Sequence, residues 1–482
     1  MRHALLVALA LLATPAAAQM RGAGATAQAI AGCRTDLLHL SHMTGWQLQW
    51  AQALATLANQ PESAQTAAIG EWTDAAAGIR ADIAQLREGL ASGRMAPAAV
   101  ADRVLQQVKT LQAALDPTPL TADPDWQRLI DGELRPALGD YAAFLEIEYV
   151  PRAGSGGLAA TPGGADCFAQ AVETWTTLSV PADEIEATGR AMLAEARREL
   201  ARAAGVDESA LPQLLADLRR EAPATSREEL LAVSNAAMER ARQALPRWFN
   251  SGRLPPVAIE PIAAHREPFE VAGVYRAAAG DASAAYLVNL SRPGERRLMA
   301  EVIAFHETLP GHHLAFSLAG DGGSPNAGFI EGWAIYAEYL ADEMGLYGSA
   351  RDRAGMRAKH LWAASRLIVE PGLHLRGWTR AQAIDFMRAN TALSDAEIAV
   401  EVDRYLVMPG QSLAYMLGAG RIRRARDRAR TALGDRFDIR AFHDVVLCPG
   451  ARPLARLDSD IDAWIASASN GRPSDPGCRR PS

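Results

Sequence analysis

A short segment rich in histidine and glutamate has the residue types and spacing of a metal centre. Residues 306–313 read His-Glu-Thr-Leu-Pro-Gly-His-His, and Glu331 follows in the next helix-forming stretch. Zinc hydrolases commonly carry His-Glu-x-x-His on one helix, because residues four apart reach the same metal while the glutamate activates water. Here Pro310 stands where the second histidine belongs. Because proline cannot continue a regular helix, we expect an interruption at Pro310-Gly311.

Two histidines after this interruption compete for the role of second ligand. A bulge of two residues would return His312 to the place of the missing ligand. On an unbroken helix His313 would share a face with His306, but about 10.5 Å further along the axis, which is too far for shared ligation. We therefore predict His306, His312 and Glu331 as metal ligands, with His313 orienting a ligand or meeting the substrate.

The chemistry of this set points to zinc as the cofactor. Two histidines and one carboxylate leave a fourth position open, which is typical of catalytic zinc sites. Glu307 then has the place of a general base. Glu338 lies on the same face of a predicted helix over residues 330–340 as Glu331, either behind the ligands or as a rival ligand. The ordinary alternative, a solvated helix end, explains the joint occurrence of four such residue types less well.

The elements that must position these residues are predicted to be mainly helical. Ala- and Leu-rich stretches with polar residues on the complementary faces predict helices over residues 37–57, 64–90, 98–115 and 183–204. A further helix over residues 295–305 leads into the motif. Residues 284–290 give one of very few strand signals, and a substrate chain could pair beside this strand. An ordinary core hairpin is the alternative interpretation.

Two irregular segments divide the chain. Residues 152–164, rich in Gly, Ala and Pro, predict a surface loop, and residues 254–268, with four prolines, predict a connection between two halves. We place a boundary near residue 180. This gives an N-terminal helical region over residues 19–180 and a catalytic region over residues 181–482, packed together as one two-lobed unit.

The first residues indicate the compartment. A basic start, an apolar run over residues 4–14 and a small-residue cleavage site predict a secretory signal peptide over residues 1–18. The apolar run is too short for a stable bilayer anchor, and no cysteine stands at the cleavage site to carry a lipid. We therefore expect a periplasmic or secreted protein without a stable membrane anchor.

The cysteines and the charge agree with that compartment. Four cysteines follow the predicted signal peptide, at Cys33, Cys167, Cys448 and Cys478. They allow three disulfide pairings between which the sequence cannot choose, although we favour Cys33 with Cys167 and Cys448 with Cys478. The net charge is -7 over 482 residues, without a run of like charges, which argues against nucleic acid as a partner.

Four segments together resemble one bacterial protein family. They are HETLPGHH at 306–313, EGWAIYAEYL at 331–340, RLIVEPGLH at 366–374 and RYLVMPGQSLAYMLG at 404–418. The set resembles domain-of-unknown-function family 885 over roughly residues 180 to 466, whereas the N-terminal part matches weakly. That family is similar, at a distance, to carboxypeptidase Taq, oligopeptidase F and angiotensin-converting enzyme. The resemblance implies a large, mainly α zincin-like metallopeptidase fold of gluzincin type, with a small β-sheet beside the active-site cleft.

The resemblance also implies roles for residues outside the ligand set. It places the second ligand on Gly311-His312, and it implies that Tyr415 donates a hydrogen bond to the developing oxyanion. A tyrosine that only packs within a helix is the alternative.

The resemblance also implies contacts with substrate for three further residues, on weaker grounds. His374 is a candidate for contact with substrate or oxyanion, and Arg404 with Tyr405 for contact with a terminal carboxylate. Structural roles are the alternatives for all three. Glu370 stands where the family is expected to have Asp.

The leading hypothesis is a secreted zinc-dependent hydrolase that cleaves amide bonds, with small peptides as substrates. Glu307 would take a proton from the attacking water and pass it to the leaving amine, without a covalent acyl-enzyme. The alternative is a catalytically silent, metal-containing helical binding protein. The intact Glu307 beside the first predicted ligand argues against a purely structural metal.

Overall fold

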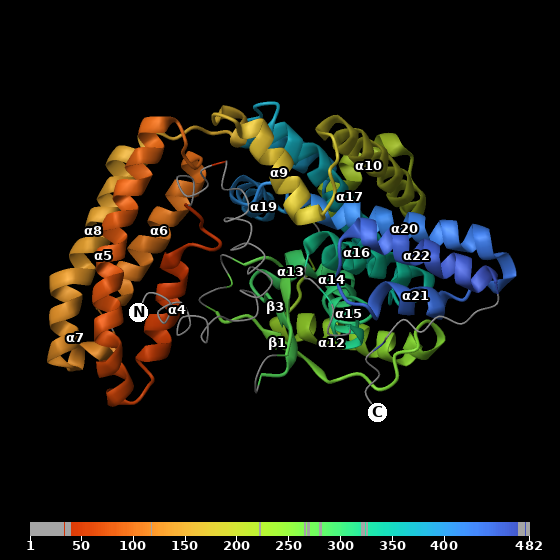
Figure 1. The fold of residues 1–482 in the computed structure, drawn as a ribbon, viewed down its shortest axis with the longest axis horizontal. Helices are drawn as coiled ribbons and strands as arrows, with labels where there is room; N and C mark the ends of the chain where they lie inside the picture. The colour runs from red at the N-terminus through yellow and green to blue at the C-terminus, as the bar shows by residue number, and fades with distance from the viewer. Residues whose placement is uncertain are drawn as a thin grey trace.

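The computed structural model shows a mainly helical fold with one small sheet (Figure 1). It describes residues 33, 40–116, 118–220, 223–264, 267, 270–278, 282–319, 323, 326–470 and 478. The predicted signal peptide lies outside the described residues. Helices α4 to α8 stand side by side at one end of the molecule, and the other helices gather with the sheet to form the larger part (Figure 1).

The N-terminal group is built from long helices whose apolar faces meet. Its members are α4 (Trp46–Leu57), α5 (Glu62–Ser92), α6 (Ala98–Ala114), α7 (Pro124–Leu129) and α8 (Arg135–Ala143). Short π-helical segments join α7 to α8 and extend α8 as far as Tyr149. Helix α5 ends at Gly93, whose φ of 69° is in the left-handed region that glycine favours. The helices predicted over residues 64–90 and 98–115 are confirmed.

The larger group contains the predicted motif. Its helices before the motif are α9 (Gly164–Thr176), α10 (Ala182–Ala204), α11 (Leu211–Arg220), α12 (Arg227–Ala244) and α13 (Pro293–Arg296). The motif lies on α14 (Ala300–Glu307) and α15 (His312–Leu318), and the remaining helices are α16 (Ala327–Glu343), α17 (Ala350–His374), α18 (Arg380–Asn390), α19 (Asp395–Val407), α20 (Leu413–Leu433), α21 (Ile439–Leu447) and α22 (Leu454–Ser469). Helix α9 packs against α16, α17 and α20. Helix α9, which precedes the predicted boundary near residue 180, therefore packs with the larger group.

A buried aspartate ties the two groups together. Asp403 on α19 accepts hydrogen bonds from Arg103 of α6, at 2.5 Å, and from Arg380 of α18, at 2.5 Å. Its side chain is fully buried, so the two guanidinium groups compensate a charge that would otherwise be expensive to bury. The disulfide between Cys33 and Cys167 adds a covalent link to α9.

The sheet has three strands, β1 (Val257–Pro261), β2 (Gly273–Arg276) and β3 (Ala284–Val288), in the order β1-β3-β2. Strand β3 pairs parallel with β1 and antiparallel with β2. The predicted strand is confirmed, but the prediction that substrate pairs beside it is wrong, because both of its edges are occupied. The proline-rich connection also contains β1, an edge strand that tolerates Pro261 at its end.

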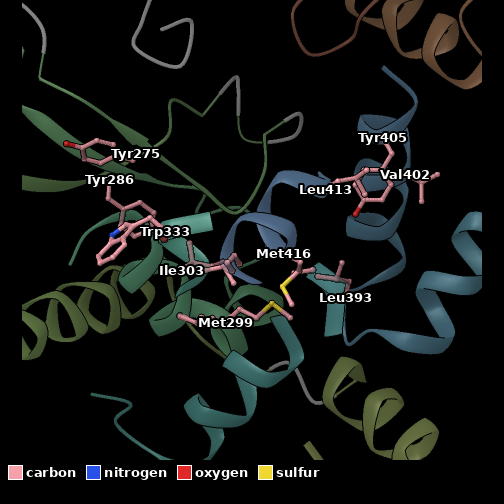
Figure 2. Close-up of a cluster of buried hydrophobic side chains, with 14 of the residues drawn as sticks. Tyr275, Tyr286, Met299, Ile303, Trp333, Leu393, Val402, Tyr405, Leu413 and Met416 are labelled. Carbon is pink, nitrogen blue, oxygen red and sulfur yellow. The ribbon is translucent and has the colours of Figure 1, made fainter. Parts of the chain in front are cut away.

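Close packing of α16 on α20 brings two parts of the predicted site together. A side chain at Gly418 of α20 would lie 1.9 Å from the backbone oxygen of Gly328, and one at Gly332 would lie 2.6 Å from the backbone of Gly418. These glycines let the two helix backbones touch, and they position Glu331 of α16 near Tyr415 of α20. Figure 2 shows the apolar side chains of this region, which come from the sheet, from the helices of the motif and from α19 and α20.

Both favoured disulfides are present, Cys33–Cys167 and Cys448–Cys478. Such bonds persist outside the reducing cytosol, so they indicate an extracytoplasmic protein. Within the described residues, a search for helices with the length and apolarity of a membrane span finds none.

Candidate metal centre

The helix interruption predicted at Pro310 is present and brings two histidines to one point. Helix α14 ends at Glu307, the Leu309–Pro310 peptide bond is cis, and α15 begins at His312. A side chain at Gly311 would lie 1.9 Å from the backbone oxygen of His306, so only glycine lets the loop fold back onto the end of α14. Trp333 of α16 donates a hydrogen bond to the carbonyl of Pro310, at 3.0 Å, and holds the loop in place.

His306, His312 and Glu331 converge as predicted. Their potential ligand atoms all lie within 4.8 Å of one another, and all three side chains are buried. Glu331 Oε2 lies 3.2 Å from His306 Nε2 and 3.5 Å from His312 Nε2. Ligands about 2.0–2.2 Å from a tetrahedral zinc lie about 3.3–3.6 Å from one another. The two distances from Glu331 therefore lie in the range that a tetrahedral metal site of this kind requires.

The hydrogen bonding of His306 supports the same conclusion. Its Nδ1 lies 2.7 Å from Glu338 Oε1, and a carboxylate can only accept, so Nδ1 carries a proton. In the neutral ring Nε2 is then a lone-pair donor that faces the carboxylate of Glu331. Either a proton on Nε2 or a metal ion stabilises these two atoms at this distance, and a carboxylate behind a histidine is the usual support for a metal ligand.

Glu338 is the centre of a buried polar group behind His306. It accepts hydrogen bonds from Lys359 and, at 3.0 Å, from His360 Nε2, both on α17. Lys359 Nζ also lies 3.4 Å from His306 Nδ1. Of the two roles predicted for Glu338, this position on the Nδ1 side of His306 favours the supporting carboxylate.

Electrostatics favour the charged carboxylates here. Burial acts to raise the pKa of Glu338, but Lys359, His306 and His360 outweigh burial and hold that pKa well below its usual range. Burial and Lys359 act to lower the pKa of His306, whereas hydrogen bonds to Glu331 and Glu338 raise it overall. The ammonium and the imidazoles therefore keep both Glu331 and Glu338 ionised despite their burial.

Glu307 is adjacent to this set, and its carboxylate is available to accept a proton. It is 7% exposed, and within the described residues no hydrogen bond or ion pair engages its carboxylate. Its charge acts on both His306 and Tyr286, so the carboxylate lies near both side chains. An unengaged carboxylate beside a metal site can accept a proton, as predicted for the general base.

Tyr415 lies against the first ligand. Its ring stacks on that of His306 with centroids 6.1 Å apart and an interplanar angle of 16°. Arg404 Nη2 donates to the phenol oxygen at 3.1 Å, which leaves the phenol proton free to point elsewhere. Burial is the largest of the effects that raise the pKa of Tyr415, so the phenol remains a donor at neutral pH. This geometry suits hydrogen bonding to a developing oxyanion.

His313 supports the sheet and is turned away from the ligand set. Its Nε2 donates to the carbonyl of Pro255 at 3.0 Å, and its Nδ1 lies 3.1 Å from the hydroxyl of Tyr275 on β2. Because the carbonyl can only accept, Nδ1 takes the hydroxyl proton and no lone pair remains for a metal. The choice of His312 over His313 as second ligand agrees with this arrangement.

Arg404 is engaged by the protein itself. It donates to Gln411 at 2.6 Å as well as to Tyr415, and it pairs with Glu401 at 3.5 Å. Since its guanidinium serves the phenol of Tyr415, it acts as a positioning residue and not as the predicted receiver of a carboxylate.

Tyr405 and His374 also differ from expectation. The hydroxyl of Tyr405 accepts from Trp362, at 3.3 Å, and from Arg366, at 3.2 Å, and its side chain is buried. His374 is fully buried, with Nδ1 accepting from the backbone of Leu158 and Nε2 donating to the carbonyl of Tyr405. Both side chains use their polar atoms internally, which speaks against the predicted contacts with substrate.

Glu370 has an equally internal role. It accepts hydrogen bonds from the backbone amides of Gly410 and Ser412 and from the hydroxyl of Ser412, at 2.6 Å. It therefore fixes the turn that leads into α20 and Tyr415.

Sequence reasoning missed several residues of the site. Lys359 and His360 on α17 support Glu338, and Arg366 lies over the ring of Tyr415 at 4.6 Å. The adjacent ionisable residues Lys359 and His360 in the middle of a long helix were the available signal, although their partner could not be named from spacing alone.

The fold and this cluster define a mainly helical protein with a candidate His₂-Glu metal centre. The chain belongs to the bacterial family of unknown function DUF885, whose family model matches residues 5–461. This match confirms the family resemblance that the four motif segments indicated, and it extends the resemblance over the N-terminal helices. No curated protein matches the sequence.

Two solved structures share the fold. A candidate lipoprotein from Colwellia psychrerythraea has a TM-score of 0.79 and 22% sequence identity, over 89% of this chain and 81% of its own. A candidate lipoprotein of unknown function from Shewanella oneidensis has a TM-score of 0.68 and 16% identity, over 88% of this chain and 83% of its own. At these identities the likeness concerns the fold alone.

Proposed function

We propose that this protein is a zinc-dependent hydrolase that cleaves amide bonds in peptides. The convergence of His306, His312 and Glu331 on one point, beside the unengaged carboxylate of Glu307, carries the proposal. Three protein ligands with an adjacent base are typical of catalytic zinc sites, and a structural site would have no use for the base. The fold would then be zincin-like, with the motif helices and the small sheet forming the walls of the active site.

The residues of the chain have distinct roles in the proposed reaction. Zinc, when bound, supplies Lewis-acid polarisation of the amide carbonyl. Glu307 accepts one proton from the attacking water, whose oxygen bonds to the carbonyl carbon, and returns it to the nitrogen as the carbon–nitrogen bond breaks. Tyr415 donates its phenol proton in a hydrogen bond to the carbonyl oxygen as that atom gains charge. Arg404 keeps the phenol in position.

The substrate chain is proposed to pair with β2 and not with β3. Within the described residues β2 is an edge strand, and Tyr275 on it lies beside His312 and His313, with ring centroids 6.2 and 5.9 Å away. An extended peptide added to this edge would gain backbone hydrogen bonds and pass close to the ligands.

We further propose that the protein acts in the periplasm or outside the cell after removal of residues 1–18. The two disulfides support this compartment, and the N-terminal sequence has the pattern of a signal peptide. Secreted protein that begins at Gln19 and has no free thiol would be the expected product by mass spectrometry.

The deciding experiment compares wild type with Glu307→Gln. Gln keeps the size of the side chain but cannot accept the proton, so about one zinc per chain should remain while peptide turnover falls at least about a hundredfold. Glu295→Gln on α13, which removes an ion-paired and partly exposed carboxylate, is the matched control and should keep its activity. A zinc-loaded wild type that cleaves no peptide in a broad library would favour the silent metal-binding alternative.

A further inference from the structure

One large apolar side chain beside the metal centre is exposed. Phe316 on α15 is 38% exposed, whereas the other exposed large apolar residues among those described, Ile147 and Val206, lie far along the chain from the motif. Single exposed apolar residues are common on protein surfaces. The position and contacts of Phe316 distinguish it from such residues.

Phe316 is the exposed end of a row of aromatic rings that starts at His312, a predicted ligand, and is otherwise buried. It lies four residues after His312, so the two side chains share one face of α15, about 6 Å apart. Its ring stacks on Tyr275 of the edge strand with centroids 5.6 Å apart and an interplanar angle of 21°. Tyr275 in turn is fixed by its hydrogen bond to His313. The exposed face of Phe316 is therefore held rigid, one helical turn from the proposed zinc site.

We propose that the exposed ring of Phe316, backed by the buried ring of Tyr275, forms a substrate subsite for a bulky aromatic or aliphatic side chain near the cleaved bond. This proposal rests on the proposed peptidase function. A peptide extended along β2 advances about 3.4 Å per residue, so a contact some 6 Å from His312 falls within about two residues of that bond. A flat, preordered aromatic face binds an apolar side chain by dispersion and by release of water, with little ordering cost.

A defined peptide series tests the subsite. Peptides that differ only in one residue near the cleaved bond, Phe, Leu, Ala or Asp, are compared by kcat/KM with wild type, Phe316→Ala and Phe316→Leu. Wild type should favour Phe over Ala at least about 10-fold, and Phe316→Ala should reduce this ratio to about 2-fold or less. Phe316→Leu should keep much of the preference for Leu. Ile147→Ala, which removes an exposed apolar side chain of the N-terminal group, should keep the wild-type ratios.

Binding measurements separate this inference from the proposed chemistry. The same peptides are titrated by calorimetry into zinc-loaded Glu307→Gln, with and without Phe316→Ala. Cleavage without any preference for apolar residues, or a preference that survives Phe316→Ala, would overturn the subsite and leave the peptidase proposal standing. A binding preference that depends on Phe316, without cleavage by wild type, would support the subsite and refute amide hydrolysis. Absence of both binding and cleavage would refute both.

Discussion

Replacement of Lys359 by Met should separate the electrostatics of the site from its packing. The chain has two lysines, Lys109 and Lys359. Apart from histidine, its other basic side chains are all arginine. The side chain of Lys359 is 8% exposed and that of its partner Glu338 is fully buried. Met has a similar length and fills the same space, so the substitution chiefly removes the ammonium group. Glu338 is then left with two imidazole partners and no permanent positive charge.

The size of the effect follows from the burial of the pair. Removal of one partner from a buried ion pair costs about 3–5 kcal/mol, because the other charge stays desolvated and uncompensated. Lys109→Met is the matched control, since Lys109 pairs with Glu146 at 3.0 Å on the surface, with side chains 42% and 58% exposed. Such exposed pairs contribute about 0–1 kcal/mol. Urea unfolding of the metal-free protein should therefore show a clear gap between the two variants.

Zinc should partly compensate the Lys359 variant. An ammonium group close to His306 repels a bound dication, so its removal should strengthen zinc binding while it weakens the metal-free fold. Competition with a chromophoric chelator measures the first effect. The double variant Lys359→Met/Glu338→Gln should regain much of the lost stability, because neither charge remains. Equal losses in Lys359→Met and Lys109→Met, or weaker zinc binding in Lys359→Met, would refute this account of the site.

Three further predictions concern the ligands, the oxyanion contact and acid stability. His312→Ala should empty the zinc site by metal analysis, whereas His313→Ala should retain most of the metal; the reverse result would exchange their roles. Tyr415→Phe should lower kcat about 10- to 1000-fold with little change in KM or zinc content, whereas Tyr405→Phe should mainly lower stability, and a kinetic defect confined to Tyr405→Phe would move the oxyanion contact to that residue. Burial lowers the pKa of three further histidines from 6.5 to about 4, 4 and 3, namely His42, His374 and His443. Between about pH 6.5 and 4 the unfolded chain binds protons that the folded protein excludes, so the free energy of unfolding should be constant above pH 6.5 and fall as the pH decreases; urea midpoints that do not change over this range would contradict the prediction.

Much of the helical architecture could be predicted because its signal is local. The apolar periodicity of α5, α6 and α10 fixes their position to within two residues of the predicted ranges. The sheet was harder to predict, since β1 lies in a proline-rich segment and the central position of β3 depends on partners before it in the chain. The packing of α9 on α16, α17 and α20 could not be predicted for the same reason, because it is a long-range property.

In the candidate site, too, local features could be predicted from the sequence, whereas contacts between distant elements could not. Pro310 and Gly311 made the interruption and the return of His312 predictable, because their backbone restrictions are independent of tertiary context. By contrast, the roles of Arg404, Tyr405 and His374 depend on which polar groups lie opposite them. Each of these side chains is engaged by hydrogen-bond partners from outside its own helix, and no spacing rule indicates such partners.

Helix α19 connects the proposed chemistry to the N-terminal helices through two consecutive residues. Asp403 binds Arg103 of α6, and Arg404 binds the phenol of Tyr415. Because both residues belong to one rigid helical turn, a shift of α6 against α19 that moves Asp403 also moves Arg404, and with it the group that holds the phenol. The N-terminal helices thus contribute to the position of Tyr415 without contacting the metal centre, which gives a physical reason for the family model to extend over both parts of the chain.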